Sequence, residues 1–180
     1  MASASNSEGL AIVRELSARK TLGTDLGELR VRVPAGAADL ARTEGLIGVR
    51  FPWFLRALFL EVGNGGFGPG YGVMGICLAG ADARPGISLE ETHLEHSAWC
   101  AECGFDWPKD LVPLIDHGCG IYTCLDCADE ELNLHEYDPN FELEETDPQW
   151  LKQALRPLGK TLEGLLGEWL ARVKASCGRG

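Results

Sequence analysis

Two pairs of cysteines have the spacing of a structural metal site. Cys100 and Cys103, followed by Cys124 and Cys127, form the pattern C-x₂-C-x₂₀-C-x₂-C. Four thiolates at this spacing can hold Zn²⁺ in a tetrahedral shell. A strand through the second pair would oppose zinc binding, because residues three apart on a strand point to opposite faces. We therefore expect no cofactor, and keep as the alternative a zinc-stabilised regulatory or scaffold protein that uses these four cysteines.

A glycine-rich stretch, NGGFGPGYGVMGI at residues 64–76, raises the possibility of phosphate binding. A dinucleotide site needs a strand, then the glycine turn, then a helix, whereas here a helix precedes the turn and a strand is expected after it. The stretch also lacks the lysine of a phosphate-binding P-loop. It is better explained as a structural loop with left-handed glycines and with Phe67 or Tyr71 packed on the domain. The residues assigned to this loop are Asn64, Gly65, Gly66, Phe67, Gly68, Pro69, Gly70 and Tyr71.

The remaining polar residues give no pattern of a catalytic site. His93 and His96 lie one turn apart on an expected helix, but the neighbouring Glu91 and Glu95 favour a solvated helix face. No Ser-His-Asp order can be identified, and the carboxylates show no specific pairing. The sequence therefore disfavours an enzyme, and we expect no catalytic residues.

Acidic residues are concentrated in one segment of the chain. The formal net charge is −11, and residues 81–150 alone carry 18 acidic and 2 basic residues. Such a segment repels nucleic acid and anionic lipid, and it attracts a basic protein partner; a solvated face that only aids solubility is the alternative. Exposed acidic side chains and nearby aromatic anchors are the candidates for partner binding: Glu90, Glu91, Glu95, Trp99, Glu102, Trp107, Asp129, Glu130 and Glu131.

Length and composition predict one folded domain in a reducing compartment. A chain of 180 residues with 45% hydrophobic content fits a single domain over 1–180, with flexible ends expected at 1–7 and 175–180. No apolar run approaches the roughly 20 residues of a membrane span. The first residues lack the basic and apolar regions of a signal peptide. Seven cysteines without an export signal then indicate free thiols and a cytoplasmic location.

Hydrophobic periodicity predicts an α+β fold with N-terminal helices, a central, mostly antiparallel sheet and a C-terminal helix. A capping box of Ser88 and Glu91 marks the start of one helix. The expected helices cover 8–20, 36–46, 52–63, 88–99 and 162–173, with a helical turn at 150–155. The expected strands cover 71–78, 111–115, 121–127 and 133–137.

Two stretches resemble the SUKH superfamily, named partly after the Smi/Knr-type regulator of yeast cell-wall assembly. They are FPWFLRALFLEVGNGGFGPGYGVMGI at 51–76 and LVPLIDHGCGIYTCLDC at 111–127, where His117 stands in place of the tryptophan of many members. The resemblance implies a non-catalytic protein-binding module. Many bacterial members are immunity proteins that neutralise a toxin, often a nuclease. It therefore points to a protein toxin or another basic protein as the partner.

Overall fold

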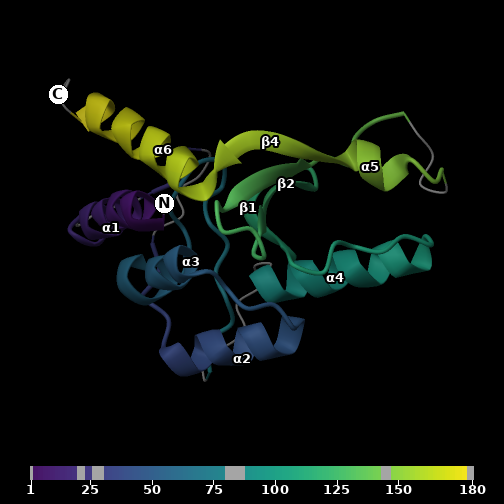
Figure 1. Ribbon diagram of the computed structural model, residues 1–180, viewed down its shortest axis with the longest axis horizontal. Helices are drawn as coiled ribbons and strands as arrows, with labels where there is room; N and C mark the ends of the chain where they lie inside the picture. The colour runs from purple at the N-terminus through teal and green to yellow at the C-terminus, as the bar shows by residue number, and fades with distance from the viewer. Residues whose placement is uncertain (1, 20–22, 26–30, 80–87, 143–146, 178–180) are drawn as a thin grey trace.

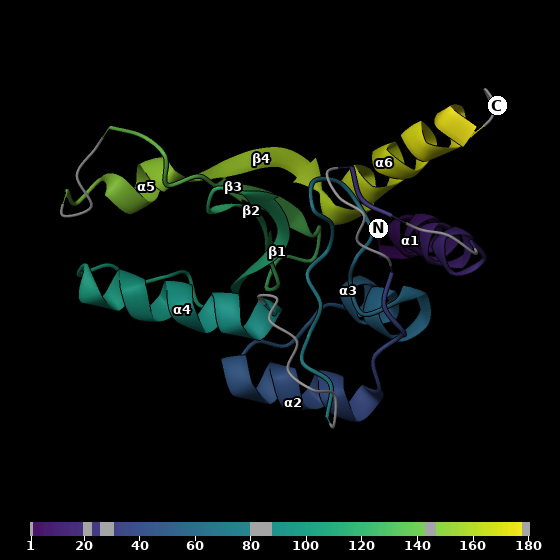
Figure 2. The same ribbon diagram turned by 180° about the vertical axis from the view of Figure 1, so that it is seen from behind.

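The computed structural model describes residues 2–19, 23–25, 31–79, 88–142 and 147–177. A four-stranded antiparallel sheet with the order β1-β2-β3-β4 forms its centre. Figures 1 and 2 show helix α4 below this sheet, strand β4 as its uppermost strand, and α1, α3 and α6 at the end of the molecule away from α5. The predicted α+β class is therefore confirmed, with N-terminal helices and a C-terminal helix.

The three expected strands of a meander are present, and a fourth strand joins them. The strands are β1 (Leu111–Gly118), β2 (Ile121–Asp126), β3 (Asn133–Tyr137) and β4 (Leu155–Thr161). The first hairpin turns at 119–120, not at 116–118 as expected. Strand β4 was not predicted, because Pro157 and Gly159 interrupt its pattern. At the edge of a sheet a proline is tolerated, since one side of the strand needs no hydrogen-bond donor.

The N-terminal helices follow the predicted pattern with two differences. They are α1 (Ala2–Ser17), α2 (Ala37–Ile47), α3 (Trp53–Ala57) and the π-helical turn η1 (Leu58–Val62). The first helix begins before the expected residue 8, and the helix expected over 52–63 changes to π-helical hydrogen bonding halfway. Gly63 ends it by donating its N–H to the Leu58 carbonyl, and its backbone is extended (φ 165°).

The strand expected at 71–78 is not formed. Val73 makes only an isolated bridge with Ile115 of β1, and Met74 donates its N–H to the Leu114 carbonyl. The glycines explain the difference, because they allow close backbone approach instead of a regular ladder. A Cβ built on Gly75 would lie 2.6 Å from the Asn64 carbonyl oxygen. The segment therefore folds back on the preceding loop instead of extending the sheet.

The other helices agree closely with the sequence. They are α4 (Leu89–Glu102), α5 (Trp150–Ala154) and α6 (Leu162–Cys177). The capping box is present: the Glu91 N–H donates to Ser88 Oγ, and the Ser88 N–H donates to a Glu91 carboxylate oxygen. Parts of the connections at 21–34 and 138–149, and parts of the ends at 1–7 and 175–180 that were expected to be flexible, lie outside the described residues.

Candidate functional site

The loop at 64–71 is here called the glycine loop. All of its residues are buried except Tyr71, which is exposed. Gly65, Gly66, Gly68 and Gly70 all have positive φ, and Phe67 is completely buried, as the sequence predicts. The Asn64 side chain donates to the Ile76 carbonyl at 2.7 Å and accepts the Ile76 N–H at 2.8 Å. These bonds hold the two arms of the loop together. The backbone N–H groups of Gly66, Gly68 and Tyr71 donate to the carbonyls of Val73, Gly23 and Asp116, respectively. These three donors are therefore already bonded within the protein.

The four cysteines of the two C-x₂-C pairs, all of them described, are not gathered around a common point. Cys100 and Cys124 are buried, whereas Cys103 and Cys127 are partly exposed. Cys127 lies beyond the end of β2, where its N–H donates to the Asp110 carbonyl. Burial raises the pKa of the Cys100 thiol to about 11 and of the Cys127 thiol to about 12, so both thiols are protonated at neutral pH in the metal-free protein. Within the described part of the chain, no group of three or more His, Cys, Asp or Glu residues is placed to hold a metal.

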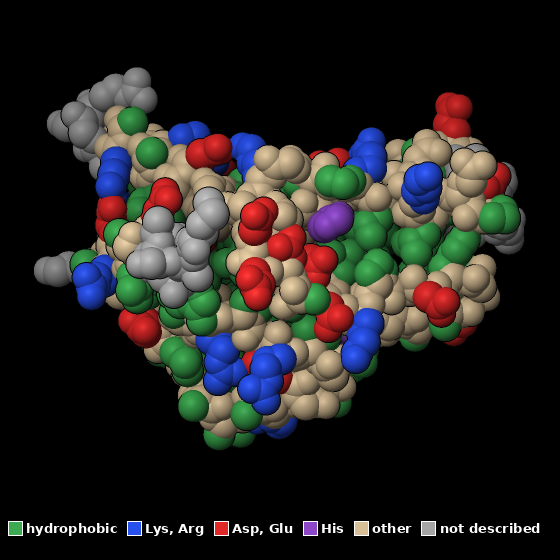
Figure 3. All heavy atoms as spheres, viewed as in Figure 1, with side chains coloured by type: hydrophobic (Ala, Val, Ile, Leu, Met, Phe, Trp, Pro, Cys, Tyr) green, Lys and Arg blue, Asp and Glu red, His purple; other side chains and the backbone are tan. Residues whose placement is uncertain are grey.

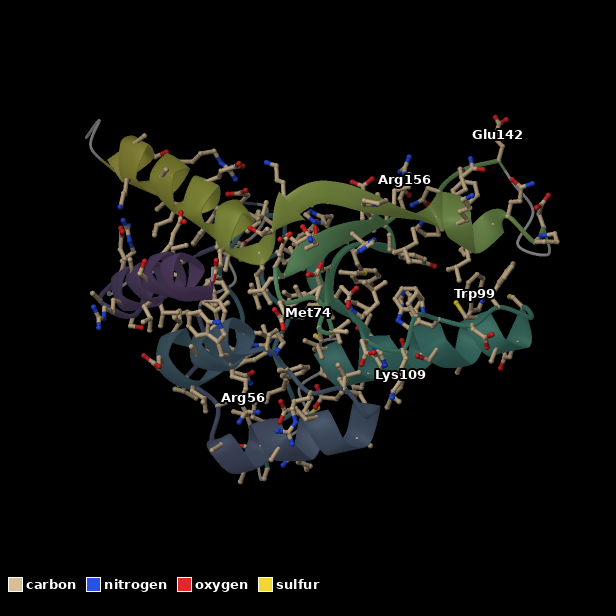
Figure 4. The ribbon with its side chains drawn as sticks, viewed as in Figure 1. Arg56, Met74, Trp99, Lys109, Glu142 and Arg156 are labelled. Carbon is tan, nitrogen blue, oxygen red and sulfur yellow. The ribbon has the colours of Figure 1, made fainter. Side chains whose placement is uncertain are left out.

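An aromatic cluster joins α4 to the sheet and to α5. His96 lies between three rings, with centroid distances of 4.9 Å to Tyr137, 5.2 Å to Tyr122 and 5.3 Å to Trp107. Trp99 packs on Trp150 of α5 at 4.9 Å. Figure 4 shows Trp99 on the side of α4 that faces the sheet and α5. His96 and Trp99 come from α4, whereas Tyr122, Tyr137 and Trp150 come from β2, β3 and α5, so only the tertiary fold assembles the cluster.

A hollow of about 240 Å³ opens in this cluster. On the face drawn in Figure 3, hydrophobic side chains gather between α4 and the elements β4 and α5, with acidic side chains beside them. We call this site the aromatic hollow; it is lined by Glu95, His96, Trp99, Gly120, Tyr122, Tyr137 and Pro139. Concave sites with aromatic walls and a few polar groups are the usual form of binding sites.

The electrostatics of the aromatic hollow are negative. Burial lowers the pKa of His96, so the ring is neutral at pH 7, and its Nδ1 lies 2.9 Å from the Thr92 carbonyl oxygen. A carbonyl only accepts, so Nδ1 carries the proton and Nε2 carries the lone pair. Burial and the negative charges of Asp116 and Glu95 raise the pKa of the Tyr122 hydroxyl. Both carboxylates therefore act on the interior of the hollow.

The predicted partner residues of α4 divide into exposed and buried ones. Glu95 and Trp99 line the aromatic hollow, while Glu91 and Glu102 are exposed elsewhere on the helix. The expectation that Glu90 is exposed is wrong: only 3% of this residue is accessible, and its carboxylate accepts the N–H of Cys77. Helical periodicity places Glu90 on the face turned toward α2, unlike Glu91 and Glu95.

Trp107 is likewise a core residue rather than a free anchor. It is 8% exposed, and its Nε1–H donates to the Leu111 carbonyl at 2.8 Å. It supports the aromatic hollow from behind through its contact with His96. The sequence could not separate Trp107 from Trp99, because both follow acidic residues in the same segment.

The remaining predicted residues, Asp129, Glu130 and Glu131, lie in the turn between β2 and β3. Gly120 and Pro139 of the aromatic hollow lie at the opposite end of this hairpin. Asp129 is occupied within the turn, where it accepts the N–H of Glu131 and the side-chain amide of Asn133. The structure thus brings Glu95 and Trp99 together with the hollow, and separates them from the acidic turn.

All residues of the aromatic hollow lie in the part of the chain that matches a known protein family. The model of the SMI1 / KNR4 family (SUKH-1) matches residues 34–153 of the chain. This chain belongs to that family. The SMI1 / KNR4 family includes toxin immunity proteins, and its members are generally non-catalytic immunity or regulator domains. The matched region begins before α2 and ends within α5, so the glycine loop and every residue of the aromatic hollow lie inside it. No curated protein matches the chain.

Several residues of the hollow were not predicted from the sequence. The pattern around His96 favours a solvated helix face, yet His96 is only partly exposed and His93 is 4% exposed. The available signal is the i, i+3 spacing of His96 and Trp99, which places both on one face of a helix. Tyr122 and Tyr137 give no signal of their own, because they lie far apart in sequence and become opposite partners only in the β2–β3 register.

No helix in the described residues is long and apolar enough to cross a membrane.

Proposed function

We propose that this protein is a non-catalytic immunity protein that binds and neutralises a protein toxin, and that the aromatic hollow is part of the binding surface. The observation that carries the proposal is the hollow itself: the partly exposed rings of Trp99 and His96 lie beside the exposed carboxylate of Glu95, inside the region matched by a family that includes toxin immunity proteins. Tryptophan is among the residue types that dominate binding energy at protein interfaces.

Charge supports a basic partner. Residues 81–150 carry 18 acidic and 2 basic residues, and the described residues that line the hollow include no Lys or Arg. A field of this sign accelerates association with a positively charged protein and disfavours nucleic acid. Six cysteines of the described residues are free thiols, which supports action in the reducing cytoplasm.

The experiment that tests this function uses the toxin encoded beside the gene for this protein. We expect the purified chain to bind that toxin and to protect growing cells that express it. The association rate, followed by stopped-flow fluorescence, should fall steeply as salt is raised, because the attraction between opposite charges is screened.

Charge reversal then locates the surface. Glu95→Lys with Glu102→Lys should lower the association rate at low salt by roughly tenfold. Glu61→Lys with Glu8→Lys, at exposed positions on η1 and α1, is the control, because it changes the net charge by the same amount away from α4. An adjoining toxin that does not bind, or the absence of an adjoining toxin gene, would contradict the immunity function. Equal association rates for all variants would remove the acidic face of α4 from the interface.

A further inference from the structure

The size of the aromatic hollow points to a single side chain as its occupant. Its volume of about 240 Å³ lies below the range of pockets that enclose drug-sized ligands, which is about 300–1,000 Å³. The walls are the rings of Trp99, Tyr122 and Tyr137, with His96 between them. Such a lining suits a flat or elongated group that can stack on aromatic rings.

The polar groups of the hollow are hydrogen-bond acceptors and negative charges. Glu95 is a carboxylate at the rim, and the neutral His96 carries a lone pair on Nε2 because its Nδ1–H donates to the Thr92 carbonyl. Asp116 adds negative charge from the strand beside Tyr122. The basic side chain of Arg156 is already engaged by Glu136 and Asp138, and Figure 4 shows it on the side of β4 turned away from α4.

We infer that the aromatic hollow receives an arginine side chain from the bound partner, an inference that rests on the proposed function and names the group that is recognised. A guanidinium is planar, always charged and carries five N–H donors, so it stacks on the rings while donating to Glu95 and to His96 Nε2. A lysine ammonium is a compact, strongly hydrated charge that loses more on entering an aromatic site and does not stack as a plane.

A small probe tests this inference without the toxin. Nα-acetyl-L-arginine N-methylamide is titrated into the ¹⁵N-labelled protein while the indole N–H of Trp99 and the backbone N–H of Gly120 are followed by NMR. We expect saturable shifts at both positions, with a dissociation constant on the order of millimolar. The citrulline analogue has nearly the same shape but no charge, and it should bind about tenfold more weakly. The lysine analogue should bind roughly threefold more weakly than the arginine analogue.

Matched variants on one helix complete the experiment. Glu95→Gln should weaken binding of the arginine analogue roughly fivefold. Glu102→Gln removes the same charge from the same helix outside the hollow, and it should leave binding unchanged. Trp99→Leu should abolish the shift at Gly120; if this variant does not fold, the exposed Glu95→Gln substitution still decides the matter.

Several results would overturn the inference. Absence of shifts at Trp99 and Gly120, or equal affinity for the arginine and citrulline analogues, would exclude recognition of a cation in the hollow. Equal affinity for the lysine analogue would exclude the specific assignment to guanidinium. Because the probe assay needs no toxin, its failure is separable from failure of the immunity function: toxin binding without arginine binding refutes only the occupant, and arginine binding without toxin binding refutes only the function.

Discussion

The glycine loop and the aromatic hollow are both unusual in composition, but they differ in what the fold leaves accessible. In the glycine loop, residues 64–70 are buried, and the Asn64 amide and several backbone N–H groups are bonded to the protein itself. In the aromatic hollow, Trp99 and His96 remain partly exposed and Glu95 is exposed. The most conspicuous motif of the chain therefore uses its polar groups for the fold, whereas the carboxylate of Glu95 at the hollow stays accessible to solvent.

The largest effect should come from adding a methyl group inside the glycine loop. Gly65→Ala places a Cβ 2.5 Å from the Val73 carbonyl oxygen and 2.7 Å from the Gly75 nitrogen, at a φ of +77°. We expect a loss of more than about 4 kcal/mol, because both contacts are with backbone that cannot rotate away. Urea unfolding measures the loss. Gly104→Ala is the matched control, with φ +80° and open space around its Cβ, and should cost about 1–2 kcal/mol. Similar losses in both variants would mean that the loop is not tightly packed.

Removing the Asn64 side chain tests whether the loop depends on its hydrogen bonds. Asn64→Ala leaves the buried N–H and carbonyl of Ile76 without their partner, which should cost roughly 2–4 kcal/mol in urea unfolding. Asn140→Ala is the control, since its amide donates to the Cys119 carbonyl in an exposed position and should matter by less than about 1 kcal/mol. A loss at Asn64 no larger than that at Asn140 would be inconsistent with a buried structural role.

Two glutamates on α4, one buried and one exposed, should differ in their effects on stability and on binding. Glu90 is buried and accepts the Cys77 N–H at 2.8 Å, whereas Glu95 is exposed at the hollow. Glu90→Ala should lower the free energy of unfolding by about 2 kcal/mol, while Glu95→Ala should change it by less than about 0.5 kcal/mol. In the toxin-binding assay the order should reverse, with the larger effect at Glu95. The same order in both assays would argue against two separate roles.

As the pH falls, stability should be lost first through protonation of His93 and His96 and only later through protonation of the carboxylates. Burial lowers the pKa values of His93 and His96 below the usual 6.5. The unfolded chain therefore binds protons first, and stability that is present above pH 6.5 should decrease as the pH falls from there through the folded pKa values. The lowered pKa values of Asp129 and Asp138, held down by hydrogen bonds from Glu131 and Asn140, matter only below their usual 3.8.

Thermal unfolding at pH 7 and pH 5 measures the histidine contribution. The variant with His93→Gln and His96→Gln should show a smaller difference between the two pH values than the parent protein. His117, whose pKa is also lowered by burial, leaves a residual dependence in the same direction. An unchanged difference in the double variant would show that His93 and His96 do not control acid sensitivity.

The smallest effect is expected from removal of metal. Because the four cysteines of the two C-x₂-C pairs are not placed around one point, metal analysis of the purified protein should find less than one zinc per chain. Addition of EDTA should leave the unfolding temperature unchanged. One tightly held zinc that is lost in Cys100→Ser would instead favour the zinc-stabilised alternative, since structural zinc contributes directly to folding.

Local signals determined much of what was predictable. The Ser88 and Glu91 capping box located the start of α4, and short runs rich in apolar residues, bounded by turn residues, located β1, β2 and β3, because these features depend on neighbours within a few residues. The two stretches at 51–76 and 111–127 also identified the family. The order of helix and glycine turn, which is the reverse of that in a dinucleotide site, was enough to argue against phosphate binding.

Only the tertiary structure decided which of these residues form a surface. Glu90 and Glu95 are both glutamates of α4, yet packing against α2 buries the first and leaves the second exposed. Tyr122 and Tyr137 meet because of the β2–β3 register, and Trp99 meets Trp150 because α5, which precedes β4, lies opposite α4 (Figure 1). Pro157 argues against a strand when only the sequence is considered, but β4 can contain it because β4 lies at the edge of the sheet. Composition and short-range pattern fix the elements, but burial depends on contacts between elements that are distant in the chain.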